Sequence, residues 1–268
     1  MKRRTAGVML GILTVVCVGL VLSAVYPFTT SDPHAAKPPS ERFTVGNASG
    51  YSASGSIIVG GEVRLAFEGV LTPDGAWYQR VVDEGVISEG YRPSANGTVY
   101  HRLTIEGAEA AEERREQIIA DEDQALVRED LDGDGGTFVI EQNATGVADP
   151  IQGTASVFVN SLFVAGYEAE GTDPSAVTVY EPQSGWYDGR ETYRITGASG
   201  AVHVDADTHE LISANVSWEV TVPAGTYARY VLVRLTSDEP TTFRIEFEFD
   251  PDDQDLERPT WVAEPDSE

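Results

Sequence analysis

The most informative shortage in this sequence is of basic residues beyond the first four positions. The 268-residue chain has 18 Lys and Arg against 44 Asp and Glu, and three of the basic residues lie in the opening Met-Lys-Arg-Arg. From residue 29 onward, 15 basic residues (18 − 3) stand against 44 acidic ones, a net charge of −29. A surface of that sign repels phosphate, so nucleic acid is excluded as a partner.

The acidic excess also sets the conditions under which the chain can fold. Like charges at this density oppose a compact state through self-repulsion. The Debye length falls from about 10 Å at 0.1 M salt to about 3 Å at 1 M, so molar salt removes most of that repulsion. We therefore predict a salt-adapted, halophilic surface.

Cysteine and the common catalytic motifs are scarce as well. Cys17 is the only cysteine, so no disulfide is expected within the chain. We find no Gly-x-Ser-x-Gly nucleophile motif, no glycine-rich phosphate loop and no paired-cysteine metal site in the sequence. We accordingly expect a non-enzymatic protein, with no catalytic residue and no cofactor assigned.

The first 28 residues carry the longest apolar run of the chain. Ala6 to Tyr26 is uncharged, and as a helix at about 1.5 Å per residue it would span about 31 Å, the thickness of one bilayer core. We favour an uncleaved transmembrane anchor over a cleaved signal peptide, because Leu22–Ala24 is a poor cleavage site. A lipoprotein signal would use Cys17, but Val16 stands where such signals carry a small residue. The preceding basic cluster predicts a single-pass cell-membrane protein with its C-terminal domain outside.

Four of the five asparagines stand in N-x-S/T sequons, at Asn47, Asn96, Asn143 and Asn215. Such sequons are acceptors for N-linked glycans on exported proteins. The four sites are consistent with an extracellular glycoprotein.

Composition divides the rest of the chain into three segments. Residues 29–54 are rich in Pro, Ser and Gly without periodicity, which predicts a flexible stalk. Residues 55–250 alternate in hydrophobicity and form the extracellular domain, and residues 251–268 form an acidic tail in which Trp261 is the one large residue that could fold back.

The 55–250 segment predicts an α+β fold. Apolar residues alternate with polar ones in several runs, as in half-buried strands: Val63 to Leu71, Val99 to Ile105, Ile212 to Val220 and Phe243 to Phe249. A charged stretch with a thin apolar stripe at 108–130 predicts a surface helix, and 152–167 fits a helix or a strand. We expect about ten strands in a large curved antiparallel sheet with one or two helices on one face.

One short stretch has the spacing of a calcium-binding loop. In "DLDGDGGTFVIE", Asp130, Asp132 and Asp134 alternate and Glu141 stands twelfth, as in the loop between two helices that binds Ca²⁺. The residues after Gly135 favour a strand over the exit helix. Drawn out at about 3.3 Å per residue, Glu141 would lie about 23 Å from Asp134. We therefore lean against a calcium site here.

A second acidic stretch, "HVDADTH", places His203, Asp205, Asp207 and His209 at every second position. A continuous strand would project all four side chains to one face, where they could hold a metal ion. The same letters also form a hairpin turn, which would break that face. We favour the turn.

Two resemblances follow from these patterns. "YRITGASGAVHVDADTHELISANVSWEV", Tyr193 to Val220, resembles a recurrent pair of strands in uncharacterised cell-surface proteins and lipoproteins of halophilic archaea. The strand–helix–strand order over 55–250 is similar to the periplasmic lipoprotein carriers, whose curved half-barrel and helices enclose an apolar cavity. That resemblance implies a fold, and it assigns no functional residue to this chain.

Three functions remain open from the sequence. The first is binding of a lipid or other apolar ligand between sheet and helices, which needs a cavity of about 300 Å³ or more. The second is a structural or interaction protein of the cell surface with no small-molecule ligand, whose concave face is filled by its own side chains. The third is a hydrolase, for which the sequence offers no motif.

Overall fold

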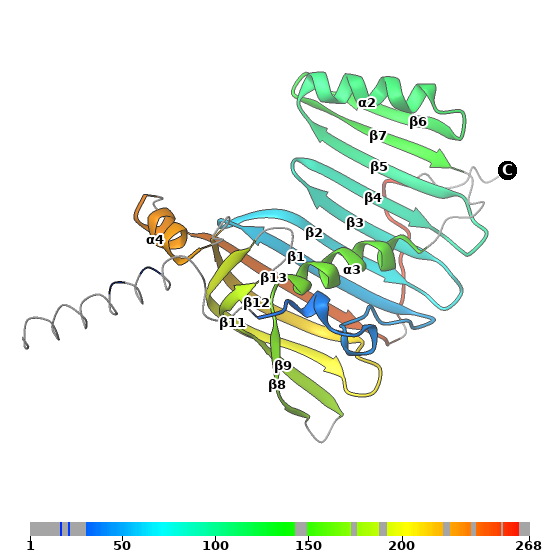
Figure 1. The fold of residues 1–268 in the computed structure, drawn as a ribbon. Helices are drawn as coiled ribbons and strands as arrows, with labels where there is room; N and C mark the ends of the chain where they lie inside the picture. Colours follow the sequence, from blue (N-terminus) through cyan, green and yellow to red (C-terminus); the bar gives the residue numbers. More distant parts are fainter. Residues whose placement is uncertain are drawn as a thin grey trace, which may run out of the picture.

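A single sheet organises the molecule (Figure 1). The computed structural model describes residues 17, 21, 31–142, 149–172, 176–187, 192–221, 226–236, 240–252 and 254–262. Its 13 strands follow the spatial order β6-β7-β5-β4-β3-β2-β1-β13-β12-β11-β9-β8, with β10 paired to β11. The strands are β1 (Tyr51–Val59), β2 (Glu62–Leu71), β3 (Trp77–Asp83), β4 (Val86–Arg92), β5 (Val99–Glu106), β6 (Gln124–Leu131), β7 (Gly135–Gln142), β8 (Tyr167–Thr172), β9 (Val177–Pro182), β10 (Gly185–Tyr187), β11 (Tyr193–Asp205), β12 (Leu211–Thr221) and β13 (Thr241–Asp250).

The predicted α+β class is confirmed. Neighbouring strands pair antiparallel throughout this sheet. Three α-helices accompany it in the described part of the chain, namely α2 (Ala108–Ala120), α3 (Pro150–Ser161) and α4 (Tyr227–Thr236). The strand count exceeds the expected ten because short or highly charged strands such as β6 and β10 carry little apolar alternation.

The register defines two faces that run the width of the sheet. Successive residues of a strand point to opposite faces, so directly paired residues share a face. One such row reads Leu103, Ser88, Val81, Phe67, Gly55, Phe247, Ala214 and Val202. Both α2 and α3 pack on the side of this row, which we call the helical face; we call the other side the open face.

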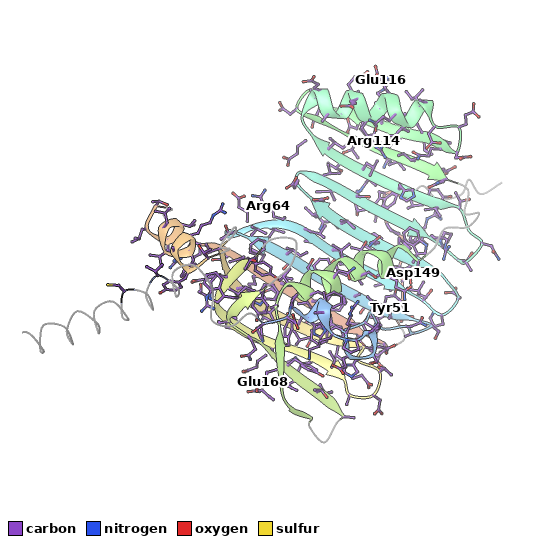
Figure 2. The ribbon with its side chains drawn as sticks, viewed as in Figure 1. Tyr51, Arg64, Arg114, Glu116, Asp149 and Glu168 are labelled. Atoms are coloured by element: carbon purple, nitrogen blue, oxygen red, sulfur yellow. The ribbon has the colours of Figure 1, made fainter. Side chains whose placement is uncertain are left out.

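The structure shows a helix, α3, in the segment for which the sequence allowed either a helix or a strand. Asp149 caps its first turn by accepting hydrogen bonds from the backbone N–H groups of Ile151 and Gln152, and Pro150 occupies a first-turn position, where its missing N–H costs nothing. Tyr51 of β1 donates its hydroxyl hydrogen to Oδ2 of Asp149 at 2.5 Å, which ties the start of the helix to the sheet (Figure 2).

The helix predicted over 108–130 is wrong in its second half. Helix α2 ends at Ala120, and the chain returns as the edge strand β6. Ile118 is buried, and the helix packs over β5, β6 and β7 with Phe138 and Ile140 beneath it. Most residues of β6 are exposed, so its sequence lacks the apolar alternation that identifies a strand.

The stalk expected at 29–54 is not a free linker over its described part. His34 and Phe43 are buried in the main core, Thr44 bridges Glu210, and β1 already begins at Tyr51. His34 stacks on Phe43, with ring centres 3.9 Å apart. The Pro-rich composition of this segment reflects two 3₁₀ turns that carry it across the helical face.

His34 makes the stability of this segment depend on pH. Burial lowers its pKa from 6.5 to about 4, and the positive charges of Lys37 and Arg42 act in the same direction. The unfolded chain therefore binds a proton between pH 6.5 and 4 that the folded chain does not. We expect stability to be full above pH 6.5 and to fall by up to about 3 kcal/mol as the pH drops to 4.

The measurement for His34 compares denaturant unfolding of the wild type and of His34→Gln at pH 7 and pH 4.5 in molar salt. Glutamine can still accept the hydrogen bond that Nε2 of His34 accepts from the backbone N–H of Phe43. The variant should lose less stability than the wild type on acidification, because carboxylate titration is common to both. Equal losses would contradict the assignment.

Of the acidic tail expected at 251–268, the described part that ends at residue 262 folds back over the open face. Trp261 and Val262 are buried against Tyr91 and Val139, and the Arg102 guanidinium lies 5.4 Å from the centre of the Trp261 ring. The tail thereby covers the open face over β4 and β7, and it leaves the central strands uncovered.

The expected anchor, residues 1–28, lies outside the described residues except for Cys17 and Val21, which are helical and exposed. None of the described helices has both the length and the apolar character needed to cross a membrane.

Candidate functional site

The space between α3 and the sheet is filled by side chains. Phe158 of α3 is fully buried, and its ring centre lies 4.8 Å from that of Phe67 and 6.1 Å from that of Phe247. A Cβ added at Gly55 would lie 2.8 Å from the Phe158 ring, so the helix sits directly on the backbone of β1. The described residues leave no apolar cavity in this interface for a lipid.

A groove of about 660 Å³ does run along the outer side of α3, between the helix and residues 39–45. Its helical wall consists of Gln152, Ser156 and Asn160, which lie four residues apart on the solvent side of α3. Phe43 and Val159 form part of its base. The groove is therefore an open surface feature with a mixed polar and apolar lining, to which Pro39, Val45 and Phe163 also contribute.

The open face of the sheet has a depression of its own, lined mainly by polar side chains. A hollow of about 580 Å³ lies over β2, β1, β13, β12 and β11, and it adjoins a second of about 430 Å³ with which it shares Ser54, Glu68 and Glu248. Strands β1 and β12 contribute serines and one asparagine to this hollow, whereas β2 and β13 contribute carboxylates. Short side chains beside long ones produce the depression.

Hydrogen bonds fix part of this surface. Ser56 donates to Oε2 of Glu246 at 3.1 Å, and Arg244 forms an ion pair with the same carboxylate at 2.5 Å. Ser213 Oγ lies 3.2 Å from Nδ1 of His203. These contacts hold the rim of the hollow in one geometry.

Two carboxylates in the middle of the hollow lack such partners. Ser54 pairs with Glu248 on one side and Glu68 on the other, so the three side chains stand in one row. Among the described residues, neither glutamate forms an ion pair. This row presents hydrogen-bond acceptors to solvent, and it can bind a group that donates hydrogen bonds.

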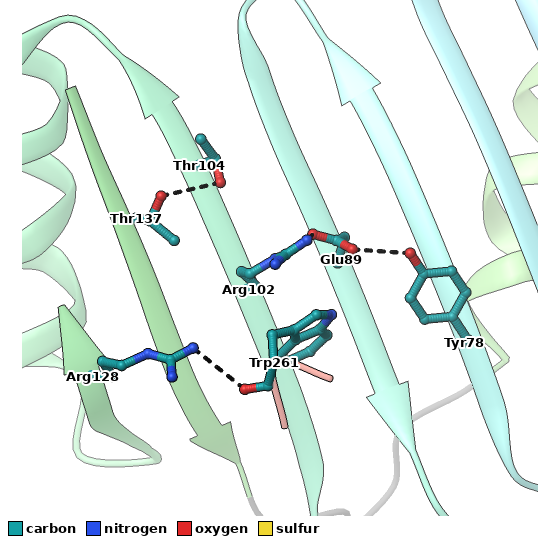
Figure 3. Close-up of polar contacts among 7 residues, drawn as sticks. All are labelled: Tyr78, Glu89, Arg102, Thr104, Arg128, Thr137 and Trp261. Atoms are coloured by element: carbon teal, nitrogen blue, oxygen red, sulfur yellow. Dashed lines mark hydrogen bonds and ion pairs between the residues drawn. The ribbon is translucent and has the colours of Figure 1, made fainter. Parts of the chain in front are cut away.

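The same row continues toward the covered half of the open face. Glu68 pairs with Arg80, Arg80 with Glu89, and Glu89 with Arg102. Glu89 is buried, forms an ion pair with Arg102 and accepts a hydrogen bond from the Tyr78 hydroxyl at 2.9 Å. Figure 3 shows this pair beside Trp261, whose carbonyl oxygen accepts from Arg128 at 3.4 Å. Glu89 and Arg102 therefore neutralise each other, whereas Glu68 and Glu248 form no ion pair among the described residues.

The calcium-like loop is a hairpin turn. The predicted strand at Thr137–Glu141 is present as part of β7, and Asp132 to Asp134 form the turn that joins it to β6. Glu141 pairs with Tyr100 and Ala125, at the far end of the hairpin from Asp134. Oδ1 of Asp132 accepts from the backbone N–H of Asp134 at 3.1 Å. Asp130, Asp132 and Asp134 thus stay near one another, and Glu141 does not join them.

We expect calcium to leave this protein unaffected. Without Glu141 the three aspartates lack the bidentate ligand that closes a site of this kind. Titrating the protein with millimolar calcium in molar salt should hardly move its melting temperature, and Asp132→Ala should be near neutral. A calcium-dependent rise that Asp132→Ala abolishes would show that the turn is a site.

The second acidic stretch is a hairpin turn, as favoured. Oδ1 of Asp205 accepts hydrogen bonds from the backbone N–H groups of Asp207 and Thr208. These bonds hold the pKa of Asp205 below its usual value. His203 faces the hollow, whereas His209 lies in the turn with a positive φ of 59°, so the row of four ligands does not form. Within the described residues, no cluster of three or more His, Cys, Asp or Glu could hold a metal ion.

The asparagines of three sequons are exposed, namely Asn47, Asn96 and Asn215. Asn96 lies in the β4–β5 turn, and Asn215 lies on the open face at the hollow, opposite the buried Ala214 and Val216. Asn143 lies outside the described residues, directly after the end of β7. Sequence alternation along β12 predicts the exposure of Asn215, and the structure confirms it.

Sequence reasoning did not assign the hollow, because five strands assemble it. One signal was available in each of two strands: Ser52, Ser54 and Ser56 alternate in β1, and Glu246, Glu248 and Asp250 alternate in β13. Only the register β1–β13 brings these two series together.

A scan against models of protein families found no match for this chain, and searches of curated proteins and of solved structures found none either.

Proposed function

We propose that this chain is a membrane-anchored, outward-facing, non-catalytic domain of a halophilic cell envelope, which acts as an interaction module. The surface it uses is the hollow on the open face. The observation that carries the proposal is the contrast between the two faces. The helical face is filled by Phe158, Phe67 and Phe247, whereas the open face presents Glu68 and Glu248, which form no ion pair among the described residues.

The chemistry of the hollow favours a hydrophilic partner rich in hydroxyl groups, such as the carbohydrate of neighbouring cell-surface glycoproteins. Carboxylates accept hydrogen bonds from hydroxyl groups, and serine side chains both donate to them and accept from them. In molar salt, Coulomb attraction is screened beyond about 3 Å, so short hydrogen bonds carry recognition. The four sequons and the predicted anchor support an extracellular location, where such partners occur.

Binding of a lipid or other apolar ligand is the second candidate. It draws on the similarity of element order to the lipoprotein carriers. The filled interface beneath α3 weighs against it, because an apolar ligand needs a dry chamber of about 300 Å³ or more. The groove outside α3 has the volume, but it is open to solvent and its lining mixes apolar side chains such as Phe43 and Phe163 with polar ones.

Cysteine crosslinking in the host cell tests the interaction surface. In a Cys17→Ser background, Ser54→Cys places a thiol in the hollow, and Ser88→Cys places one on the helical face at a matched, half-buried strand position. Both changes are nearly isosteric. A thiol-to-carbohydrate crosslinker should join Ser54→Cys, and not Ser88→Cys, to a glycosylated envelope component.

Crosslinking from neither position, or equal crosslinking from both, would contradict the proposal. Copurification of one apolar ligand per chain would favour the second candidate instead. Each variant must show wild-type melting behaviour in molar salt before its crosslinking is compared.

A further inference from the structure

Helix α4 carries a net positive charge within an acidic chain. Its sequence, Tyr227 to Thr236, contains Arg229 and Arg234 and no Asp or Glu, whereas the chain from residue 29 onward has a net charge of −29. Of the other two α-helices, α2 has more acidic than basic residues and α3 has no charged residue. Figure 1 shows the helix at the ends of the central strands, in the connection between β12 and β13 and apart from α2 and α3.

The outer side of α4 is apolar. Leu232 is 60% exposed and Leu235 is 79% exposed, and Ala228 is exposed as well. These residues follow the i, i+4, i+7 spacing that places side chains on one face of a helix. At about 100° per residue, Arg229 and Arg234 lie on opposite sides of that face. An exposed apolar stripe with arginines along both edges is the pattern of a helix that lies in a membrane interface.

Helix α4 lies close to the point where the N-terminal segment enters the domain, which indicates what could cover its exposed apolar residues. Tyr230 on the inner side of the helix contacts Trp186, with ring centres 5.6 Å apart. The backbone N–H of Ser31 donates to the carbonyl oxygen of the same Trp186 at 2.7 Å. The N-terminal segment therefore joins the domain next to α4.

Few residues connect the apolar N-terminal run to the domain. The apolar run ends at Tyr26, five residues before Ser31, and five residues reach at most about 18 Å when fully extended. If the run spans the membrane, Ser31 lies within that reach of the bilayer surface, and α4 contacts Trp186, the residue to which Ser31 is hydrogen-bonded. The exposed sequons Asn47 and Asn96 lie elsewhere: Asn96 is in the β4–β5 turn, at the opposite end of the strands from the β12–β13 connection that carries α4.

We infer that α4 docks on the membrane surface, with Leu232 and Leu235 inserted among the lipid chains and Arg229 and Arg234 at the headgroups. This inference rests on the anchor in the proposed function. It gives the domain a second attachment to the membrane, which would fix the orientation of the domain. The turns at the opposite strand ends, such as the β4–β5 turn, would then point away from the membrane. Long arginine side chains can reach the headgroups while their stems stay in the apolar layer.

The test uses the full chain with Cys17→Ser, reconstituted in phosphatidylglycerol–phosphatidylcholine vesicles in molar KCl. A nitrobenzoxadiazole fluorophore is attached at Leu235→Cys or, as the control, at Ile119→Cys. Ile119 is 58% exposed, and it lies on α2, which packs over β5, β6 and β7. We expect the probe at position 235 to be blue-shifted and to show a several-fold lower iodide quenching constant than the probe at position 119.

The outcomes separate the two proposals. If the protein floats with the vesicles but both probes are quenched equally, the docking of α4 is overturned and the anchor stands. If the protein does not float with the vesicles, the anchor fails and the docking fails with it. As a further check, Leu232→Ser in the labelled Leu235→Cys chain should raise iodide quenching at position 235, and no rise would also overturn the docking.

Discussion

Lowering the salt from molar to about 0.1 M is expected to unfold the domain or to lower its melting temperature by about 10 °C or more, which corresponds to about 3 kcal/mol or more. The cause is the net charge of −29 from residue 29 onward. Glu68 and Glu248 flank Ser54 from two different strands, so about two strand spacings, about 10 Å, separate them. At about 0.1 M the Debye length is also about 10 Å, so the two carboxylates repel each other, whereas at molar salt their repulsion is screened.

Two variants show which charges cause the dependence of the melting temperature on salt. Glu68→Gln combined with Glu248→Gln removes two charges from the middle of the hollow and should make the melting temperature less dependent on salt. Glu112→Gln removes a charge that lies 3.7 Å from Arg115, so it should not. Melting curves in a KCl series measure both. A melting temperature that stays constant from molar to 0.1 M salt would contradict the salt-adapted surface.

Replacing Phe158 by alanine is expected to lower the free energy of unfolding by about 3–5 kcal/mol. The side chain is fully buried and packs between Phe67 and Phe247 beneath α3. The surrounding rings come from different elements, and the backbone of β1 lies against the helix at Gly55, so the structure cannot close the cavity easily. Denaturant unfolding in molar salt measures the loss.

The neighbouring Val157→Ala is the matched control. Val157 lies on the same helix and is 46% exposed. Its truncation should change stability by no more than about 0.5 kcal/mol, because alanine also favours the helix. If Phe158→Ala were as mild as Val157→Ala, the interface beneath α3 would not be the packed core described above.

The alternation of apolar and polar residues predicted those strands that bury only one of their two faces. β2, β12 and β13 follow their apolar periodicity, and the Asn96–Gly97 turn stands between β4 and β5. Helix α3 was ambiguous because its residues are apolar on more than one side. Asp149 followed by Pro150 is a helix-start signal that would have identified it.

Other features depend on contacts distant in sequence. The burial of His34 and Phe43 comes from rings such as Tyr167, whose centre lies 5.1 Å from that of Phe43, so a Pro-rich composition alone predicts a linker. Strand β6 carries almost no apolar alternation because it is an exposed edge. Strand order was not readable from the sequence, and the hollow on the open face therefore could not be assembled in advance.

Native mass spectrometry of the full chain, purified from its host membranes, tests the central claim most directly. The account predicts a polypeptide that retains residue 1 or 2, carries carbohydrate mass that Asn47→Gln, Asn96→Gln and Asn215→Gln each reduce, and holds no stoichiometric lipid. The matched control Asn160→Gln, outside any sequon, should leave the carbohydrate mass unchanged. One bound lipid per chain would contradict the account, because the filled interface beneath α3 leaves no room for it.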